Sequence, residues 1–299
     1  KIMPLRALGL EGGSAYDIMQ SLRYAAGLPN DSNTLPQQPA DIINLSLGGP
    51  NYFQAVQDLY DELHELGIIV VAAAGNDETD EPSYPASYNN VISVAATDFN
   101  GDQAPYSNYG PNVDIAAPGG DVTQDLNNDG YSDGIFSLSI DDTSGSLVSI
   151  YYPENGTSMA SPHVAGVAAL MKAVYPELTA QEFNNLLIAG ELTDDQGEAG
   201  RDDIYGHGNV NALKAVQAAQ RLVNGTQPTP PAPSIVASPV AITFGENSVT
   251  NLTLTNQGGG SPAISSITSS ASWLTISATS TDAFGLGDYQ ISIDKTGLP

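Results

Sequence analysis

Short, unbroken apolar runs constrain the fold of this chain more than any other feature of its sequence. They are rich in Ile and Val and show no polar alternation, which is typical of strands buried on both faces of a parallel sheet. The runs cover residues 2–8, 42–47, 68–74, 91–96 and 113–117. Apolar side chains at helical spacing over residues 14–26 and 52–66 lie between them. This alternation predicts an α/β fold with a mostly parallel sheet flanked by helices.

Further along the chain, the strand and helix alternation gives way to a hairpin and then to helices. Two strand-like segments flank DDTSGS within residues 135–152 and predict a β-hairpin. A helix should follow over about residues 158–174. Another should begin after Thr179, because Glu182 completes a capping box with it. The last helix should run from near Asn211 to near Val223.

The composition changes sharply near residue 225, which predicts two domains. Residues 1–224 form the first, and the Pro-rich stretch 225–233 is an extended linker by composition. Residues 234–299 are rich in Ser and Thr and lack helical periodicity, so they predict a small all-β module, a sandwich. The chain opens on what reads as mid-strand and ends just after a strand. We therefore expect an internal fragment of a longer precursor, with the β module truncated.

The charge balance excludes several classes of function. Only 8 Lys and Arg stand against 34 Asp and Glu, for a net charge of −26, which repels nucleic acid and anionic membranes. The chain has no cysteine and therefore neither disulfides nor thiolate chemistry. No apolar run reaches the length of a membrane span. We expect a folded, acidic monomer that neither binds nucleic acid nor inserts into a membrane.

The stretch ENGTSMASPHVAGVAALM (154–171) leads a loop of small residues into an apolar helix. Ser158 falls in the first helical turn, beside unpaired N–H groups and the positive end of the helix dipole. Position alone would favour a plain helix cap. His163 follows five residues later, roughly 140° round the helix, so it should be a packed, hydrogen-bonded residue and not the base for Ser158.

GTSMASPHVAG resembles the nucleophile motif of the subtilisin-like serine proteases, the subtilases. The resemblance implies that Ser158 is the acylating nucleophile. IIVVAAAGND (68–77) resembles the subtilase strand whose terminal Asn donates its amide to the oxyanion, a role that falls to Asn76. Such a preorganised donor stabilises the charge that develops in the transition state. Without the resemblance, Gly-Asn would only indicate a turn.

INLSLGG (43–49) resembles the subtilase edge that pairs with extended substrate. The resemblance implies pocket walls, for the residue before the scissile bond, made by Ser46, Leu47, Gly48, Ala73, Ala74 and Gly75. SYPASY (83–88) resembles the pocket floor and implies a cis peptide at Tyr84–Pro85. Segments 106–120 and 205–216 resemble architectural parts of the family. The resemblance spans residues 1–224 and does not extend to the β module. That module, through ASWLTIS (271–277), instead resembles the immunoglobulin-like or BACON-type appendages of secreted bacterial enzymes.

DLNNDGYSDG (125–134) carries oxygen ligands at alternating positions, followed by a glycine for a sharp turn. This is the beginning of the D-x-[DN]-x-[DN]-G calcium loop. The twelfth position is Phe136 in place of the bidentate Glu, which excludes an EF-hand. We expect a shorter Ca²⁺ loop, with Asp121 as an additional carboxylate; a solvated acidic turn is the alternative. The expected ligands are Asp125, Asn127, Asp129, the Tyr131 carbonyl and Asp133.

Two parts of the catalytic triad are missing from the sequence. The subtilase Asp motif, D-[ST]-G, and His motif, H-G-T-H, do not occur, and the only histidines are His64, His163 and His207. A serine nucleophile needs a base and a carboxylate that orients it. In the family both motifs precede the strand that would begin this chain, so the resemblance places them upstream of Lys1. We expect residues 1–299 alone to be inactive or nearly so.

The resemblance therefore implies the C-terminal part of a secreted bacterial serine endopeptidase. Its substrates would be proteins or peptides, with broad specificity. One alternative is a pseudoprotease, a peptide-binding module that lacks a base. The other is a calcium-dependent structural or adhesive protein, which would leave the serine and oxyanion motifs unexplained.

Overall fold

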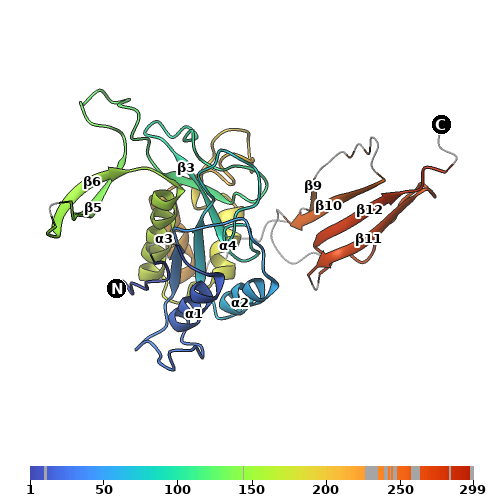
Figure 1. Ribbon diagram of the computed structural model, residues 1–299, viewed down its shortest axis with the longest axis horizontal. Coiled ribbons are helices and arrows are strands. Elements are labelled where there is room, and N and C mark those ends of the chain that lie inside the picture. Colours follow the sequence, from blue (N-terminus) through green and yellow to red (C-terminus); the bar gives the residue numbers. More distant parts are fainter. Residues whose placement is uncertain are drawn as a thin grey trace. The chain divides into compact units, whose positions relative to one another are not determined.

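The computed structural model divides the chain into two compact units, Lys1–Gln227 and Pro228–Pro299 (Figure 1). Each is considered by itself. The described residues are 1–9, 12–143, 145–225, 235–238, 242, 244, 248–256, 263–282 and 284–296. All of the predicted linker except Gly225 lies outside the described residues.

A six-stranded sheet with the order β1-β2-β3-β4-β8-β7 forms the centre of the first unit. The first four strands are parallel and β8 continues parallel to β4, whereas β7 is antiparallel to β8. The strands are β1 (Ile42–Leu45), β2 (Ile69–Ala73), β3 (Ile92–Thr97), β4 (Ile115–Pro118), β7 (Thr193–Asp194) and β8 (Asn209–Val210). The prediction of a mostly parallel α/β sheet is confirmed.

Five helices of the described residues flank the sheet. They are α1 (Ala15–Ala25), α2 (Gln54–Glu65), α3 (Thr157–Val174), α4 (Ala180–Ile188) and α5 (Ala212–Val223). Thr179 and Glu182 form the predicted capping box at the start of α4. Each predicted helix is therefore present within a residue or two of its expected bounds.

Strand β2 shows why its sequence is apolar without alternation. Ile69 and Val71 belong to the core cluster that contains α3, α4 and α5, whereas Val70 and Ala72 belong to the cluster that contains α1 and α2. Both faces of the strand are buried, so every position favours an apolar side chain.

The predicted strand over residues 2–8 is wrong. Residues 1–8 have no regular structure, and Ile2 is 94% exposed. Pro4 lacks an N–H for a strand ladder, and no described strand pairs with the segment. Apolar composition alone does not form a strand when no neighbour supplies the hydrogen bonds.

The predicted hairpin is confirmed as β5 (Ile135–Asp141) paired antiparallel with β6 (Val148–Glu154). It projects from the body of the first unit (Figure 1). Strand β6 leads directly into α3, so the hairpin is joined to the segment that carries Ser158.

The second unit contains one four-stranded antiparallel sheet with the order β11-β12-β10-β9. Its strands are β9 (Ile235–Ser238), β10 (Val249–Asn256), β11 (Leu274–Thr281) and β12 (Gly287–Ile293). The all-β prediction is confirmed. The described residues show no second sheet, so the sandwich stays a prediction. Within the described parts of the chain, no helix is long and apolar enough to span a membrane.

Candidate active site

Ser158 is the second residue of α3, where the helix begins at the carboxyl edge of the parallel sheet. The N-cap is Gly156, whose φ of 151° is a conformation that favours glycine. Its N–H donates to the Gly119 carbonyl, just beyond β4, at 3.0 Å. Ser158 is half-buried, and its own N–H belongs to the first turn, where no helical acceptor is available.

Asn76 follows β2 at the same edge and is held by Thr157. Its side-chain Oδ1 accepts from the Thr157 N–H at 2.8 Å and from the Thr157 hydroxyl at 2.9 Å. The Thr157 hydroxyl in turn accepts from the Gly75 N–H at 3.1 Å, and Thr157 is fully buried. These bonds fix the carboxamide, and among the described residues they leave its Nδ2 without a partner. That amide group is free to donate.

The Asn76 amide and the Ser158 N–H border the same space. A Cβ built on Gly156 would lie 3.6 Å from Asn76 Nδ2, Asn76 Oδ1 and the Ser158 backbone N alike, which is ordinary van der Waals contact. The two donors are therefore both close to the same point beside Gly156. Two preorganised donors around one opening suit an oxygen that gains negative charge.

Asn108 holds the loop that carries Asn76. This nearly buried side chain donates to the Ala74 carbonyl at 3.1 Å and accepts from the Asp77 N–H at 2.8 Å. Gly75 has a φ of 117°, and a Cβ there would lie 2.2 Å from Asn108 Nδ2, so only glycine fits. Sequence reasoning treated the segment of Asn108 as architectural and overlooked the role of Thr157, although Thr157 stands next to Ser158 in the motif.

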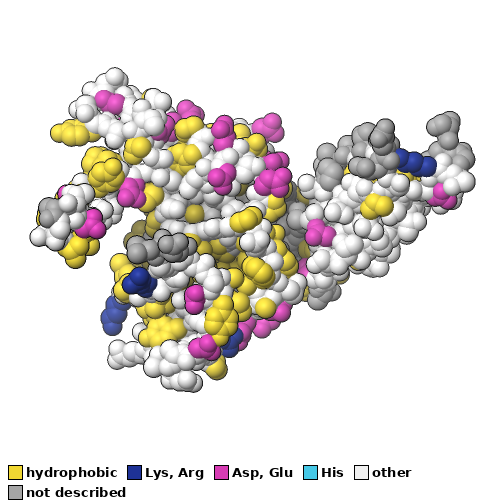
Figure 2. Space-filling model, viewed as in Figure 1, with side chains coloured by type: hydrophobic (Ala, Val, Ile, Leu, Met, Phe, Trp, Pro, Cys, Tyr) yellow, Lys and Arg dark blue, Asp and Glu magenta, His cyan; other side chains and the backbone are white. Residues whose placement is uncertain are grey.

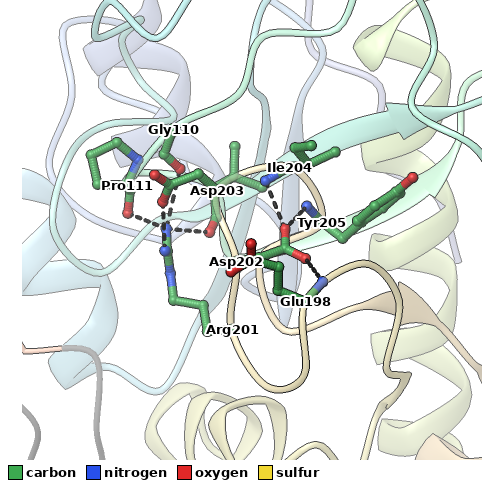
Figure 3. Close-up of polar contacts among 9 residues, drawn as sticks. Gly110, Pro111, Glu198, Arg201, Asp202, Asp203, Ile204 and Tyr205 are labelled. Carbon is green, nitrogen blue, oxygen red and sulfur yellow. Dashed lines mark hydrogen bonds and ion pairs between the residues drawn. The ribbon is translucent and has the colours of Figure 1, made fainter.

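Arg201 anchors the segment that follows Asn108 (Figure 3). Its guanidinium pairs with Asp203 at 2.8 Å and donates to three backbone carbonyls. The acceptors are Gly110, Pro111 and Val113, at 3.1, 2.6 and 3.3 Å. Hydrogen bonds from Arg201 in the 201–203 loop therefore hold the 110–113 segment in place, away from Ser158.

Ser46 lies directly after β1 and faces the start of α3. Its hydroxyl donates to the Ser158 carbonyl at 2.8 Å. Residue 162, which would normally donate to that carbonyl within the helix, is Pro162 and has no N–H. The Ser46 hydroxyl also lies 3.2 Å from the hydroxyl of Ser161. This predicted pocket residue therefore contacts the backbone of the candidate nucleophile.

The other predicted pocket residues lie on neighbouring chain segments. Leu47 and Gly48 follow β1, and Ala73, Ala74 and Gly75 end or follow the parallel neighbour β2. The predicted floor segment, residues 83–88, is hydrogen-bonded to this part of the chain, because Gly49 and Tyr84 exchange two N–H···O bonds of 2.8 and 2.7 Å. The cis peptide at Tyr84–Pro85 is confirmed. Substrate binding by this set stays a prediction.

Tyr106 supports the other side of the nucleophile loop. Its hydroxyl donates to the Gly120 carbonyl at 2.7 Å. Burial raises the pKa of Tyr106 to about 12, so the hydroxyl can keep donating even at a pH near 10, where an ordinary tyrosine begins to ionise. The Gly119–Gly120 turn is thus fixed against Gly156.

None of the three histidines lies where it could serve Ser158. His163 is exposed, not packed as expected, and a ring nitrogen lies 2.8 Å from the Met159 carbonyl on its own helix. His64 ends α2, just before β2 begins, and contacts Gln181. His207 bonds to Asp114, just before β4 begins. His64 and His207 are therefore at the amino edge of the sheet, a strand length of about 13 to 17 Å from the Ser158 edge.

The acidic loop satisfies much of its own backbone. The Asp125 carboxylate accepts from the N–H groups of Asp129 and Gly130, at 3.1 and 3.0 Å, and Asn127 Oδ1 accepts from Asp129 at 2.9 Å. Asp129 accepts from the Tyr131 N–H. The nearly buried Asp133 carboxylate accepts from the Leu126 N–H, and Asp121 bonds to Thr123. Among the described residues, no three acidic or histidine side chains gather as a metal cluster. Calcium binding here stays a prediction.

Comparisons with known proteins identify the family of this chain. Residues 1–208 match the subtilase family, peptidase S8. The chain is 37% identical over 239 residues to an extracellular basic protease of Dichelobacter nodosus, covering 77% of this chain and 37% of that protease. It is 37% identical over 218 residues to subtilisin DY of Bacillus licheniformis, and the match covers 71% of this chain and 67% of that protein.

A solved protease structure from Pseudoalteromonas arctica superposes with a TM-score of 0.63 and 38% identity, over 73% of this chain and 63% of that chain. The chain spans little more than a third of the extracellular proteases of D. nodosus and Xanthomonas campestris that it matches. The family match covers more than two thirds of the sequence and includes both Asn76 and Ser158. The chain belongs to the subtilase family of serine proteases.

Proposed function

We propose that this chain supplies the nucleophile and the oxyanion donors of a secreted serine endopeptidase. The Ser158 hydroxyl oxygen bonds to the scissile carbonyl carbon and the peptide C–N bond breaks. The amine leaves with a proton, and water then hydrolyses the acyl ester. Asn76 Nδ2 and the Ser158 N–H stabilise the carbonyl oxygen while it carries negative charge. The observation that supports this best is the Asn76 carboxamide, whose oxygen is held by Thr157 so that its amide borders the same space as the Ser158 N–H.

The base and its orienting carboxylate are proposed to come from a segment outside this sequence. The exposed face of α3 supports this part of the proposal. The helix is apolar on nearly every side, a composition typical of buried helices. Nevertheless a stripe that begins one turn after Ser158 is exposed, and Leu170 within it is 51% accessible. The stripe consists of Pro162, His163, Gly166, Ala169, Leu170 and Ala173. A segment that covers it would lie beside Ser158.

Polypeptides are the proposed substrates. The Ser46–Gly48 stretch follows the edge strand β1, where an extended chain could pair with it. The opposite wall, Ala73–Gly75, is lined by small residues. Secretion is proposed because the relatives in D. nodosus and X. campestris are named extracellular proteases.

Labelling of the full-length protein with a fluorophosphonate tests the proposal. Ser158 should be labelled, and Ser158→Ala should abolish the label. Ser161→Ala is the matched control on the same helix and should retain it, because Ser161 is buried beside Asn44. A full-length protein that is folded but is not labelled would instead indicate a peptide-binding pseudoprotease.

A further inference from the structure

The β5–β6 hairpin has one face that is almost entirely apolar. Residues directly opposite each other in an antiparallel pair share a face, and the pairs alternate between faces along the ribbon. Phe136 pairs with Pro153 and Leu138 pairs with Tyr151. Ile140 follows on the same face. We call these five residues the apolar hairpin face.

This face is uncovered in the structure. Phe136, Leu138, Ile140 and Tyr151 are 53, 70, 62 and 74% exposed. Figure 2 shows hydrophobic side chains together with acidic ones on the projecting hairpin. Contiguous apolar surface of this kind is unusual unless something binds to it.

The root of the apolar hairpin face opens into a hollow of about 400 Å³. Phe136 lines it together with Phe99 and Tyr131, which are 57 and 69% exposed. Asp98 also lines the hollow, as do Asn127, Asp129 and Asp133 of the acidic loop, which are expected Ca²⁺ ligands as well. The hollow and the hairpin face therefore form one surface that combines aromatic rings with carboxylates.

This surface adjoins the nucleophile loop. Gly120 packs against the root of the hairpin, since a Cβ there would lie 3.0 Å from the Ile135 N. Its neighbour Gly119 accepts from the Gly156 N–H at 3.0 Å, and Ser158 is two residues further. In the sheet order β1-β2-β3-β4, the proposed pocket for the residue before the scissile bond follows β1 and β2, whereas the hairpin root packs beyond β4. With the acyl part of a substrate in that pocket, the strand order puts this surface on the other side of Ser158, where the leaving group would lie.

The charge of this region has one sign. No Lys or Arg occurs between Arg23 and Lys172. The carboxylates nearest the apolar face are those of the hollow, Asp98 and Asp129 together with the nearly buried Asp133, whereas Asp141 and Glu154 lie on the opposite face of the hairpin. Cationic side chains are attracted to such a surface and anionic ones are repelled.

We propose that the apolar hairpin face and the hollow bind the part of a polypeptide substrate that follows the scissile bond. They select apolar side chains interspersed with Lys or Arg. This inference rests on the proposed function, because it needs Ser158 to be the point of cleavage. The site is continuous with the nucleophile loop, and its apolar and acidic character defines the chemistry of its occupant.

Two peptides with the same acyl-side sequence test the proposal in the full-length protein. One continues after the scissile bond with Leu, Phe and Lys, and the other with Gly, Ser and Glu. A p-nitroanilide of the same acyl part has no residues after the scissile bond, so its hydrolysis measures cleavage without binding to the proposed site. We expect kcat/KM for the first peptide to exceed that for the second by on the order of tenfold. The double variant Leu138→Ser/Tyr151→Ser should reduce this ratio to about one.

The matched control is Val148→Ser/Tyr152→Ser. It removes an aliphatic and a tyrosine side chain, 49 and 53% exposed, from the opposite face of the same hairpin. It should keep the tenfold ratio. All four side chains are exposed, so both variants should unfold at the midpoint of the unmodified protein.

Equal cleavage of the two peptides, with the anilide still hydrolysed, would overturn the proposal while leaving Ser158 as the nucleophile. Failure to hydrolyse even the anilide would contradict the proposed function instead. In that case, the binding site is tested separately by measuring the affinity of each labelled peptide for the Ser158→Ala variant. Equal affinities for the two peptides would refute the proposed binding site. A dimer that dissociates in the Leu138→Ser/Tyr151→Ser variant would assign the face to a second copy. Protection of Tyr151 from iodination in the peptide-free full-length protein would assign it to another segment of the chain.

Discussion

The hydroxyl of Ser46 donates to the backbone carbonyl of Ser158 at 2.8 Å. This bond connects the end of β1 to the first turn of α3 at the position where Pro162 leaves the helix without a donor. A backbone carbonyl without a partner costs free energy, so the serine compensates for the proline. The end of one strand thereby fixes the residue that carries the candidate nucleophile.

Ser46→Ala should therefore weaken the start of α3. We expect the free energy of unfolding to fall by about 1 kcal/mol, since Ser46 is exposed and water can partly replace its hydroxyl. We also expect slower fluorophosphonate labelling of Ser158 in the full-length protein. Ser46→Thr keeps a hydroxyl and should restore both properties. Denaturant unfolding and labelling rates measure them, and identical rates in Ser46→Ala would show that the bond does not position Ser158.

Thr157→Val tests whether the Asn76 carboxamide must be held in its orientation, because Asn76 itself stays in place. The substitution removes the hydroxyl that connects the Gly75 N–H to Asn76 Oδ1 but keeps the shape of the side chain. We expect kcat on peptide substrates to fall on the order of 10- to 100-fold, because the donor amide is no longer held in place. KM should change little. Thr157→Ser retains the hydroxyl and should stay within a few-fold of the unmodified enzyme; equal losses in both variants would contradict this role.

Gly156→Ala tests the space between the two donors. The added Cβ would lie 3.6 Å from both Asn76 Nδ2 and the Ser158 N, and a φ of 151° is unfavourable for alanine. Peptidase activity should be lost. Gly190→Ala is the control, because Gly190 also has a positive φ, of 70°, but follows α4 and a Cβ there meets nothing within 4 Å. It should lower the free energy of unfolding by about 1 to 2 kcal/mol and leave activity intact. An active Gly156→Ala enzyme would refute the assignment of this space to the oxyanion.

The features that sequence reasoning predicted are local ones. The run at 68–74 is apolar at every position because alternate residues of β2 pack into two different core clusters. The capping box of Thr179 and Glu182 involves residues three apart. Such signals need no knowledge of the tertiary structure.

The features that it missed depend on distant parts of the chain. The Thr157–Asn76 and Ser46–Ser158 bonds join residues 81 and 112 positions apart, so they follow only once the order and register of β1 and β2 are known. The two-residue strands β7 and β8 are too short to show any period. Residues 2–8 have strand composition, but no described strand pairs with them.

Ca²⁺ should stabilise the full-length protein through the acidic loop. Oxygen ligands at Asp125, Asn127 and Asp129 match the spacing of a calcium loop, and ligand binding to the folded state raises its stability. We expect millimolar Ca²⁺ to raise the melting temperature, and Asp125→Asn/Asp129→Asn to abolish the rise. Asp141→Asn/Asp142→Asn removes the same charge from the hairpin and should keep it. A rise in both variants would mean that Ca²⁺ acts elsewhere, and no rise at all would leave the loop as a solvated turn.

His207 should make the protein less stable in acid. Burial, with a smaller contribution from the nearby Arg201 charge, lowers the pKa of His207 from 6.5 to about 4. The folded state therefore holds the neutral imidazole, while the unfolded state takes up a proton below pH 6.5. Its stabilising contribution is complete above pH 6.5 and is lost as the pH falls to 4 and below, by about 3 kcal/mol in total.

Asp114 changes the stability in the opposite sense, because burial raises its pKa to about 6. Its contribution to the free energy of unfolding is therefore lost as the pH rises. Only a comparison with His207→Gln isolates the histidine. Between pH 6.5 and 4, the unfolding free energy of His207→Gln should fall less steeply than that of the unmodified protein. Parallel curves for His207→Gln and the unmodified protein would show that His207 takes up its proton equally in the folded and unfolded states.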